Sequence, residues 1–402
     1  MQHPKKNVIA LDLIGLSESY EGGATVFARS ILSEIVNNPI CNFVVILDER
    51  SKHTHEHISN NSSLITFHYF KSRDNLLVKV LYKIATQILP KSNLLSRIQR
   101  YRWHQPIKFI ENNAVVCLTP STYINFPLKG VKHYCTLHDV QEKALPQFFT
   151  RTQKVFRNAQ VLNTLRNVSG LQVSSKFVRN EIARFYPNES QKINFVIIPE
   201  GFSSREIEID SKFRRQRELP FRIIFPANYW PHKNHIVLLK ALSRLNYTHK
   251  IELICTGYLF GKELEVLTLL KQMNLKNVSF LGFVSRDELM DLYSKSHIVI
   301  SCSVYESSSL PILEGAALGC IPVASDIPSH IEMSEKFRIN LFESENVNDL
   351  EKILINTFES ISKNDYSIQE FNAKALINLS WSEIIKKYYE ILLPELKCNK
   401  LN

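Results

Sequence analysis

Two glutamates with seven residues between them stand in the segment best suited to chemistry, residues 305–317. The dipeptide Leu310-Pro311 lies between Glu306 and Glu314. Because proline is favoured in the first turn of a helix, this pattern indicates a loop opening a helix, whose N-terminus favours an anion. Carboxylates accept hydrogen bonds from sugar and ribose hydroxyls, so a ligand with hydroxyls and negative charge fits. The spacing also allows a structural alternative, in which Glu306 caps the helix and Glu314 is solvated.

A second segment, residues 225–235, places a lysine and two histidines after an apolar strand. Lys233 can lie beside a diphosphate as a point charge and stabilise the negative charge that grows on a leaving group. The alternative is a solvated loop lysine. His232 and His235 have no third ligand near them in the sequence, so surface or packing roles explain them better than a metal site. We assign no metal ligands.

In the first half of the chain, Gly22 and Gly23 follow the first apolar run and open a helix expected over residues 26–35. Paired glycines let the backbone approach a phosphate or a sugar closely, although most such pairs are only turns. His138 stands at the end of another expected strand, where a residue of a ligand site belongs. Its structural alternative is a histidine satisfied within the core.

Alternating strands and helices must position these residues, and the chain shows that alternation. Short runs rich in Val, Ile and Phe recur between longer amphipathic stretches, which indicates parallel sheets. The charged stretch 203–220 separates two α/β halves, so we expect two doubly wound domains that face a ligand cleft. The expected strands are residues 8–13, 43–47, 64–69, 115–118, 133–137 and 170–173, then 222–226, 251–256, 278–282, 298–302 and 321–324.

The composition fits a folded protein of two domains. The chain has 402 residues, of which 44% are hydrophobic, and 49 Lys and Arg against 39 Asp and Glu give a net charge of +10. Its seven cysteines are scattered, which favours a reducing compartment over a disulfide framework. An apolar stretch after Lys5 and Lys6 is similar to the start of a signal peptide, but Asp12 interrupts it and a first strand explains it better. We expect no membrane-spanning helix.

The elements around the two glutamates resemble the nucleotide-sugar site of the family-4 retaining glycosyltransferases, which have the GT-B fold. The resemblance rests on Glu306, Leu310-Pro311 and Glu314, followed by Gly-Cys-Ile-Pro-Val at 319–323 and Ser-Asp at 325–326. It covers nearly the whole chain and implies two Rossmann-like domains, with a final helix crossing back to the first. The expected parts are an acceptor-binding domain at 1–203, a nucleotide-sugar-binding domain at 204–378 and the returning helix at 379–402.

The resemblance implies roles for the residues around the helix start. Glu314 would hold the ribose hydroxyls, and Glu306, a catalytic candidate, would contact the donor sugar near its reacting face. The backbone of Ser308, Ser309 and Leu310 would hold the sugar and the diphosphate. The family usually has Gly-Phe-Gly where this chain has three serines.

The resemblance also implies roles for residues on other loops. Lys233 matches the family lysine that grips the donor phosphates and is a second catalytic candidate. Asn228 stands near the place of a common family arginine and is assigned to donor binding. Gly22 and Gly23 would line the donor side of the cleft, and His138, the third catalytic candidate, would hydrogen-bond the donor sugar.

The function implied is transfer of a hexose from a nucleoside diphosphate sugar to a hydroxyl of a glycan or lipid-linked glycan, with retention of anomeric configuration. Likeness to a subset rich in mannosyltransferases favours GDP-mannose and surface polysaccharide or lipopolysaccharide biosynthesis. We expect no cofactor and no metal, because no Asp-x-Asp pair presents carboxylates to a bridging cation. The alternatives are a GT-B sugar-nucleotide epimerase and a nucleic-acid-binding protein. The net charge alone supports the latter, so no nucleic-acid partner is expected.

A basic stretch, residues 71–108, predicts contact with a membrane. It contains nine basic residues and one acid, Asp74. A basic amphipathic helix can lie on anionic lipid, and each basic residue near the surface adds about 1 kcal/mol. An ordinary helix with a solvated basic face is the alternative. We expect a cytoplasmic protein that contacts the inner face of the cytoplasmic membrane through a helix with Leu77, Leu81, Ile84 and Ile88 on one face and Lys79 and Lys83 on another.

Overall fold

The computed structural model describes residues 7–16, 23–51, 62–89, 92–202, 220–245 and 250–398. The chain divides into two compact units, one of residues 1–200 with 381–402 and the other of residues 201–380. Gly22 and most of the charged stretch expected between the domains, residues 203–219, lie outside the described residues.

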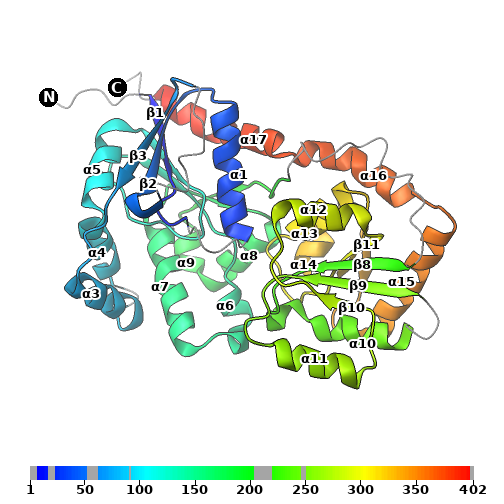
Figure 1. Ribbon diagram of the computed structural model, residues 1–402. Coiled ribbons are helices and arrows are strands. Elements are labelled where there is room, and N and C mark those ends of the chain that lie inside the picture. Colours follow the sequence, from blue (N-terminus) through cyan, green and yellow to red (C-terminus); the bar gives the residue numbers. More distant parts are fainter. Residues whose placement is uncertain are drawn as a thin grey trace. The chain divides into compact units, whose positions relative to one another are not determined.

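The first unit is built on a parallel sheet, whose seven described strands run in the order β3-β2-β1-β4-β5-β6-β7 (Figure 1). The inner strand β1 is buried along its whole length, and all but the last of its five residues are apolar. The strand order reverses between β1 and β4, which is where doubly wound sheets bind ligands beyond the strand C-termini. The strands are β1 Val8–Asp12, β2 Asn42–Asp48, β3 Ile65–Phe70, β4 Val116–Thr119, β5 Lys132–Thr136, β6 Gly170–Val173 and β7 Asn194–Ile197.

Helices separate most of these strands along the chain. α7 has a capping box, in which Thr150 and Gln153 exchange hydrogen bonds at the helix start. Val78 and Ala85 of α3 share a small core with Leu95 and Ile98 of α4 and Ala159 of α7. The helical elements are α1 Gly23–Asn37, η1 Glu49–Ser51, α3 Leu76–Gln87, α4 Leu94–Arg102, α5 His104–Asn113, α6 Gln141–Ala144, η2 Pro146–Phe148, α7 Arg151–Asn167, α8 Lys176–Phe185 and α9 Pro187–Ser190.

The last helix, α17 Trp381–Cys398, belongs to the first unit. Trp381 packs edge-on against Phe27 of α1, with 5.5 Å between ring centroids. Farther along the helix, the Tyr389 hydroxyl donates to the backbone carbonyl of Asn38 at 3.2 Å. The expected return of the final helix to the first domain is therefore confirmed.

The second unit holds a parallel sheet of six described strands in the order β10-β9-β8-β11-β12-β13. Its core strands are rich in Ile, Val, Leu and Phe, which suits a sheet covered on both faces. The strands are β8 Phe221–Pro226, β9 Ile251–Thr256, β10 Val278–Phe280, β11 Ile298–Ser301, β12 Ile321–Ser325 and β13 Asn340–Phe342. The helical elements are η4 Pro231–Lys233, α10 His235–Leu245, α11 Glu263–Gln272, α12 Arg286–Lys295, α13 Leu310–Ala317, α14 Pro328–Ser334, α15 Val347–Ser362, α16 Ser367–Leu376 and η5 Ile377–Leu379.

Candidate functional site

The loop and helix that carry the two glutamates follow the buried strand β11. Helix α13 begins at Leu310, with Pro311 in its first turn, as the sequence predicts. Gly315 brings this helix close to the sheet, because a Cβ atom there would lie 2.6 Å from the Cβ atom of Val299. This contact fixes the helix start and the loop before it relative to the strand ends.

Glu306 forms an ion pair with Lys233, although 73 positions separate them in the chain. They meet because β8 and β11 are hydrogen-bonded neighbours, so the loops that follow these strands start side by side. A hydrogen bond of 2.8 Å from the Val304 amide to the His232 carbonyl joins the two loops. The Ser303 hydroxyl donates to the same Glu306 oxygen at 2.6 Å.

The surroundings of Glu306 keep its carboxyl group ionised. Burial acts to raise the pKa of Glu306, but the charges of Lys233 and His232 and the hydrogen bonds from Lys233 and Ser303 outweigh it. The pKa therefore lies below its ordinary value. The site thus offers a fixed ammonium group beside a fixed carboxylate, which suits a ligand with both phosphate oxygens and hydroxyls.

Glu314 is held by a different cation. Arg286, the first residue of α12, donates to Oε1 of Glu314 at 2.6 Å, and the Tyr293 hydroxyl donates to Oε2 at 3.4 Å. Glu314 is buried, and Tyr293 is fully buried beside it. Burial and the Glu314 charge raise the pKa of the Tyr293 hydroxyl well above its ordinary value, so the hydroxyl stays a donor. No local pattern singles out Arg286, because 28 positions separate it from Glu314 along the chain.

The other predicted donor-binding residues of this unit lie on the same two loops. Ser308 is half-buried, Ser309 is the buried residue before α13, and Leu310 is the first helical residue. Asn228 follows β8, and its Oδ1 accepts a hydrogen bond of 2.8 Å from the backbone amide of Tyr258. The structure thus places Asn228 where its amide links the loops after β8 and β9.

An aromatic cluster, which the sequence reading missed, lies on loops after β8, β9 and β10. Trp230 packs against Phe260 with 4.3 Å between ring centroids, and Tyr258 stacks on Phe283 at 5.4 Å. All four side chains are exposed. Exposed aromatic faces near strand C-termini can stack on a planar ring such as a nucleobase. The four residues are spread over more than 50 positions of the sequence, from 230 to 283, so no local motif predicts that their rings lie together.

In the first unit, His138 is buried in the loop after β5. Its Nδ1 lies 3.5 Å from Oε1 of Glu200, a partner that the sequence did not suggest. Its ring meets the edge of Phe27 on α1, with 5.0 Å between centroids. Within the described part of the chain, Nε2 is buried and has no hydrogen-bond partner. Gly23 is the first residue of α1, and the contact between Phe27 and His138 joins this helix to the loop after β5.

His235 of the second segment has a packing role. His235 lies between the rings of Phe225 and Tyr229, at 4.4 Å and 4.7 Å. Burial lowers the pKa of His235 to about 3, so the ring is neutral at physiological pH. Among the described residues, no group of three His, Cys, Asp or Glu side chains is placed to hold a metal ion.

The chain is similar to known proteins in sequence and in fold. Residues 206–370 match the family described as Glycosyl transferases group 1. The chain is 27% identical over 262 residues to the O-antigen chain mannosyltransferase RfbU of Salmonella typhimurium, which covers 62% of this chain and 69% of that protein. A glycosyltransferase structure from Rickettsia africae covers 98% of this chain and 100% of its own, with a TM-score of 0.70 and 17% identity. Anabaena HepE, crystallised with UDP and glucose, gives a TM-score of 0.68 at 17% identity over 96% and 99% of the two chains.

The two Rossmann-like units have the GT-B fold, and the second carries Lys233 and Glu306 on the loops after neighbouring strands and Glu314 in the helix that follows. The match to the group 1 glycosyltransferases, also called family 4, covers most of the second unit, which carries these three residues.

Proposed function

We propose that this enzyme moves a hexose from a nucleoside diphosphate sugar to a hydroxyl of a glycan or lipid-linked glycan. The observation that carries the proposal is the pair of Lys233 and Glu306 beside the start of α13. GDP-mannose is the favoured donor, and surface polysaccharide assembly the favoured process. The name of the Salmonella relative, an O-antigen chain mannosyltransferase, supports both choices. The UDP bound by HepE supports a nucleoside diphosphate as the carrier.

The proposed chemistry needs positive charge where the diphosphate departs. As the bond between the sugar C1 and the phosphate oxygen breaks, negative charge grows on the diphosphate. The Lys233 ammonium group and the positive end of the α13 helix dipole stabilise that charge. The acceptor hydroxyl attacks from the same face of the sugar, which retains the anomeric configuration.

Each carboxylate then has a separate task. Glu314, oriented by Arg286, accepts hydrogen bonds from the ribose hydroxyls. Glu306 contacts the donor sugar, and the backbone from Ser308 to Leu310 holds the sugar and the diphosphate. The aromatic cluster offers a stacking surface for the base. His138 and the Gly22-Gly23 pair stay predictions of the sequence for donor-sugar binding.

Ligand binding followed by turnover tests this function. Isothermal titration with GDP, UDP and ADP should identify one nucleotide that binds, since ligands of the native state also raise its melting temperature. With the matching labelled nucleotide sugar, release of the nucleoside diphosphate should depend on an added glycan or lipid-linked acceptor. An epimerase would instead change the sugar without acceptor. Binding of none of the three nucleotides or their sugars would overturn the assignment.

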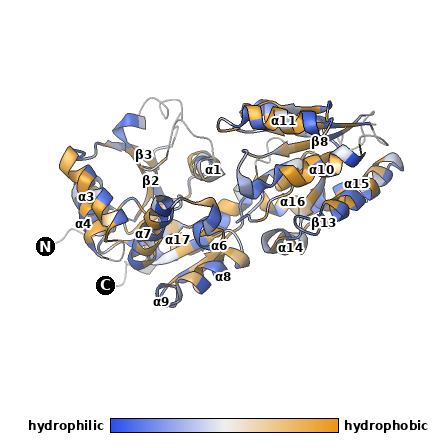
Figure 2. Cartoon of the chain, turned by 90° about the horizontal axis from the view of Figure 1, so that it is seen from below, coloured by the Kyte–Doolittle hydropathy of each residue, from blue (hydrophilic) through white to orange (hydrophobic). Residues whose placement is uncertain are grey.

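The surface of α3 supports a membrane-bound acceptor. Leu76 and Leu77 of α3 and its C-cap residue Ile88 are 79%, 65% and 69% exposed, which places three large apolar side chains on the surface of one short segment. Figure 2 shows hydrophobic residues along α3. Lys79 and Lys83 on the same helix are exposed as well. An apolar strip beside basic side chains is the pattern of a helix that lies in the interface of an anionic bilayer.

Only some of the basic side chains in residues 71–108 are available for contact with an anionic bilayer. Arg100 donates to Glu111 at 2.7 Å, and Arg102 pairs with Asp74 at 2.7 Å, so both cations are already neutralised. Arg97 is exposed. We therefore assign the lipid contact to Lys79, Lys83 and Arg97 together with the apolar residues of α3. Within the described residues, none of the helices is both long and apolar enough to cross a membrane.

A further inference from the structure

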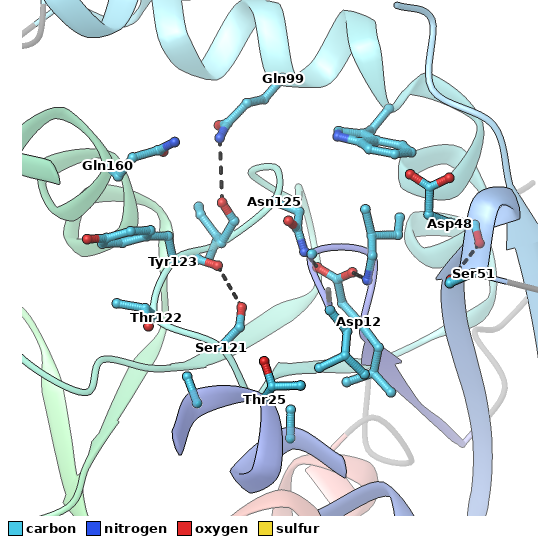
Figure 3. A pocket seen from close by; sticks show the side chains of 18 of the residues that line it. Asp12, Thr25, Asp48, Ser51, Gln99, Ser121, Thr122, Tyr123, Asn125 and Gln160 are labelled. Atoms are coloured by element: carbon cyan, nitrogen blue, oxygen red, sulfur yellow. Dashed lines mark hydrogen bonds between the residues drawn. The ribbon is translucent and has the colours of Figure 1, made fainter. Parts of the chain in front are cut away.

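A buried carboxylate, Asp12, lines a pocket of about 690 Å³ in the first unit. The pocket opens beyond the C-terminal ends of β1, β2 and β4, and Figure 3 shows Asp12 beside Asn125. The Oδ1 atom of Asp12 accepts a hydrogen bond from the Ile14 amide at 3.1 Å. Its Oδ2 accepts from the Thr119 hydroxyl at 3.2 Å and from the Asn125 side chain at 3.0 Å. Both oxygens of Asp12 are thus bonded within the fold, as expected of a structural group.

The carboxylate of Glu306 in the second unit is bonded differently. Its two donors among the described residues are the Lys233 ammonium group and the Ser303 hydroxyl, and both bind the same oxygen, Oε1. The Oε2 atom accepts no hydrogen bond from the described residues. The side chain of Glu306 is 13% exposed. One oxygen of this carboxylate is therefore fixed, and the other is left for a ligand.

The lysine alone would not fix the plane of the Glu306 carboxylate. The terminal torsion of a glutamate side chain is broad, so the carboxylate turns easily about it. A lysine ammonium group has three rotatable donors and can follow either oxygen as the carboxylate turns. The Ser303 hydroxyl adds a second donor to Oε1, at 2.6 Å. It therefore sets the plane of the carboxylate and, with it, the position of Oε2.

Ser303 is itself held in place by its neighbours. It is fully buried, and the Ser301 hydroxyl donates to its Oγ at 3.3 Å, so the single hydroxyl proton of Ser303 is directed to Glu306. The Ser303 carbonyl accepts a hydrogen bond of 2.5 Å from the hydroxyl of Ser325, the last residue of β12. The Ser325 carbonyl in turn accepts from Nδ1 of His330 on α14 at 2.8 Å. The group that orients Glu306 is thus anchored to the neighbouring strand and to a helix.

We propose that Ser303 is a positioning residue, which fixes Oε1 of Glu306 and so presents Oε2 to a hydroxyl of the donor sugar. The inference rests on the proposed function, since it states which atom of Glu306 meets the donor and what orients it. A purely structural carboxylate has no need for two donors on one oxygen. Asp12, whose donors are spread over both oxygens, shows the structural arrangement in the same chain.

Titration calorimetry of the full chain with matched pairs of ligands tests this role. The pairs are GDP with GDP-mannose, UDP with UDP-glucose, and ADP with ADP-glucose. Ser303→Ala removes one donor to Oε1 and leaves Lys233 and Glu306 in place. For the pair that the parent binds, affinity for the nucleotide sugar should fall about tenfold, the effect of one hydrogen bond to a charged group. Affinity for the nucleoside diphosphate should not change, because Glu306 contacts only the sugar.

A double-mutant cycle separates positioning from a general loss of structure. In a Glu306→Ala background no carboxylate is left to orient, so adding Ser303→Ala should cause no further loss of affinity for the nucleotide sugar. Ser325→Ala, which removes the donor to the Ser303 carbonyl, is a second variant. It should show the same pattern with a smaller loss, and it keeps the test decisive if Ser303→Ala does not fold.

Ser296→Ala is the matched control. Ser296 is also fully buried, and it stands before the first residue of β11 as Ser303 stands after the last. Its hydroxyl donates to the Leu292 carbonyl at 2.7 Å. The control variant should lower the melting temperature, since it loses a buried hydrogen bond, and leave both affinities unchanged.

The outcomes separate this inference from the proposed function. Parental affinity for the nucleotide sugar in folded Ser303→Ala, or an equal loss for both members of the pair, would overturn the inference and leave the proposed function standing. A further loss on adding Ser303→Ala to Glu306→Ala would also overturn it. If the parent binds none of these ligands, the proposed function fails, and the inference fails with it.

Discussion

The guanidinium group of Arg286 lies 2.6 Å from the carboxylate of Glu314, which belongs to helix α13. Lys233 forms an ion pair with Glu306, which lies in the loop before that helix. The two glutamates are therefore not equivalent, because each has its own cation from a different loop. Arg286 follows β10 and Lys233 follows β8. A carboxylate held by a cation stays ionised and oriented, which is what recognition of neighbouring hydroxyls requires.

The Glu314 carboxylate should govern nucleotide affinity. Glu314→Ala removes the acceptor for the ribose hydroxyls and should reduce kcat/KM on the order of a hundredfold, chiefly through weaker nucleotide binding. Arg286→Met leaves Glu314 buried without its cation, so nucleotide affinity should also fall. Titration calorimetry with the nucleotide that binds the parent measures both. Arg286→Lys, which keeps the charge, is the control and should lose less than Arg286→Met; parental affinity in Glu314→Ala would remove that residue from the site.

The Lys233 ammonium group should act on turnover. Lys233→Ala removes charge that stabilises the leaving diphosphate, so kcat should fall about a hundredfold or more. Glu306→Gln should keep nucleotide affinity while damaging transfer, because the nucleotide is held elsewhere. Steady-state kinetics with calorimetry separate the two effects. Wild-type turnover in folded Lys233→Ala would contradict the proposed role.

Catalysis should proceed without a divalent cation. Lys233 and the start of α13 supply the positive charge that a bridging cation provides in other transferases. Activity after dialysis against EDTA should match the untreated enzyme. Loss of activity with EDTA, followed by recovery on adding Mg²⁺ or Mn²⁺, would count against this mechanism.

Lipid binding should depend on α3. The triple change of Lys79, Lys83 and Arg97 to Gln should release the protein from vesicles containing phosphatidylglycerol, while nucleotide binding persists. Sedimentation should also fall as salt is added. The matched control replaces Lys240, Lys271 and Lys276 with Gln, which removes the same charge from exposed positions of the second unit. Equal sedimentation of both triple variants with anionic vesicles, or no binding by the parent, would reject the surface.

The Asp12 carboxyl should leave a signature in the pH dependence of stability. Burial raises its pKa from 3.8 to about 6, although the hydrogen bonds from Asn125, Ile14 and Thr119 oppose the shift. The folded state therefore binds more protons than the unfolded state between these values. This contribution to the free energy of unfolding is full below the unfolded pKa and is lost as the pH rises through about 6.

Asp12→Asn should remove this contribution, which is on the order of 2 to 3 kcal/mol by the pKa difference. Urea unfolding from about pH 4 to about pH 7 measures it as the difference between the parent and the variant. The difference curve is the informative quantity, because the buried His133, whose pKa is lowered to about 4, has the opposite pH dependence in both proteins. A flat difference curve would show that Asp12 does not titrate in this range.

The strand positions are the part of the fold that local pattern predicts well. The strand expected at 170–173 is β6 as observed, and Ser175 caps the helix that follows by accepting from the Val178 amide. The pattern missed β7 and β13. The side chains of β7 are half-buried or exposed, and β13 has only three residues, so neither presents a long apolar run.

In the candidate site, local motifs likewise predict some residues but not the partners that the fold brings to them. Glu306, Glu314 and Lys233 stand in recognisable segments, and the structure brings Glu306 and Lys233 into contact. Their further partners were not predictable, since Arg286 and Ser303 matter only through where the strands place them. The pocket around Asp12 draws on residues from 12 to 160, which no local motif connects.

The place of α17 has a consequence for synthesis of the protein. During translation, the first 200 residues leave the ribosome long before Trp381 is synthesised. The compact unit that they form nevertheless includes residues 381–402. Until then, Phe27 lacks the ring that covers it, and Tyr389 cannot reach the end of α1. The first unit therefore cannot complete its packing until the second unit has been translated, and the second unit can fold before it. A nascent chain stopped before residue 381 should bind nucleotide while its N-terminal half stays open to proteolysis.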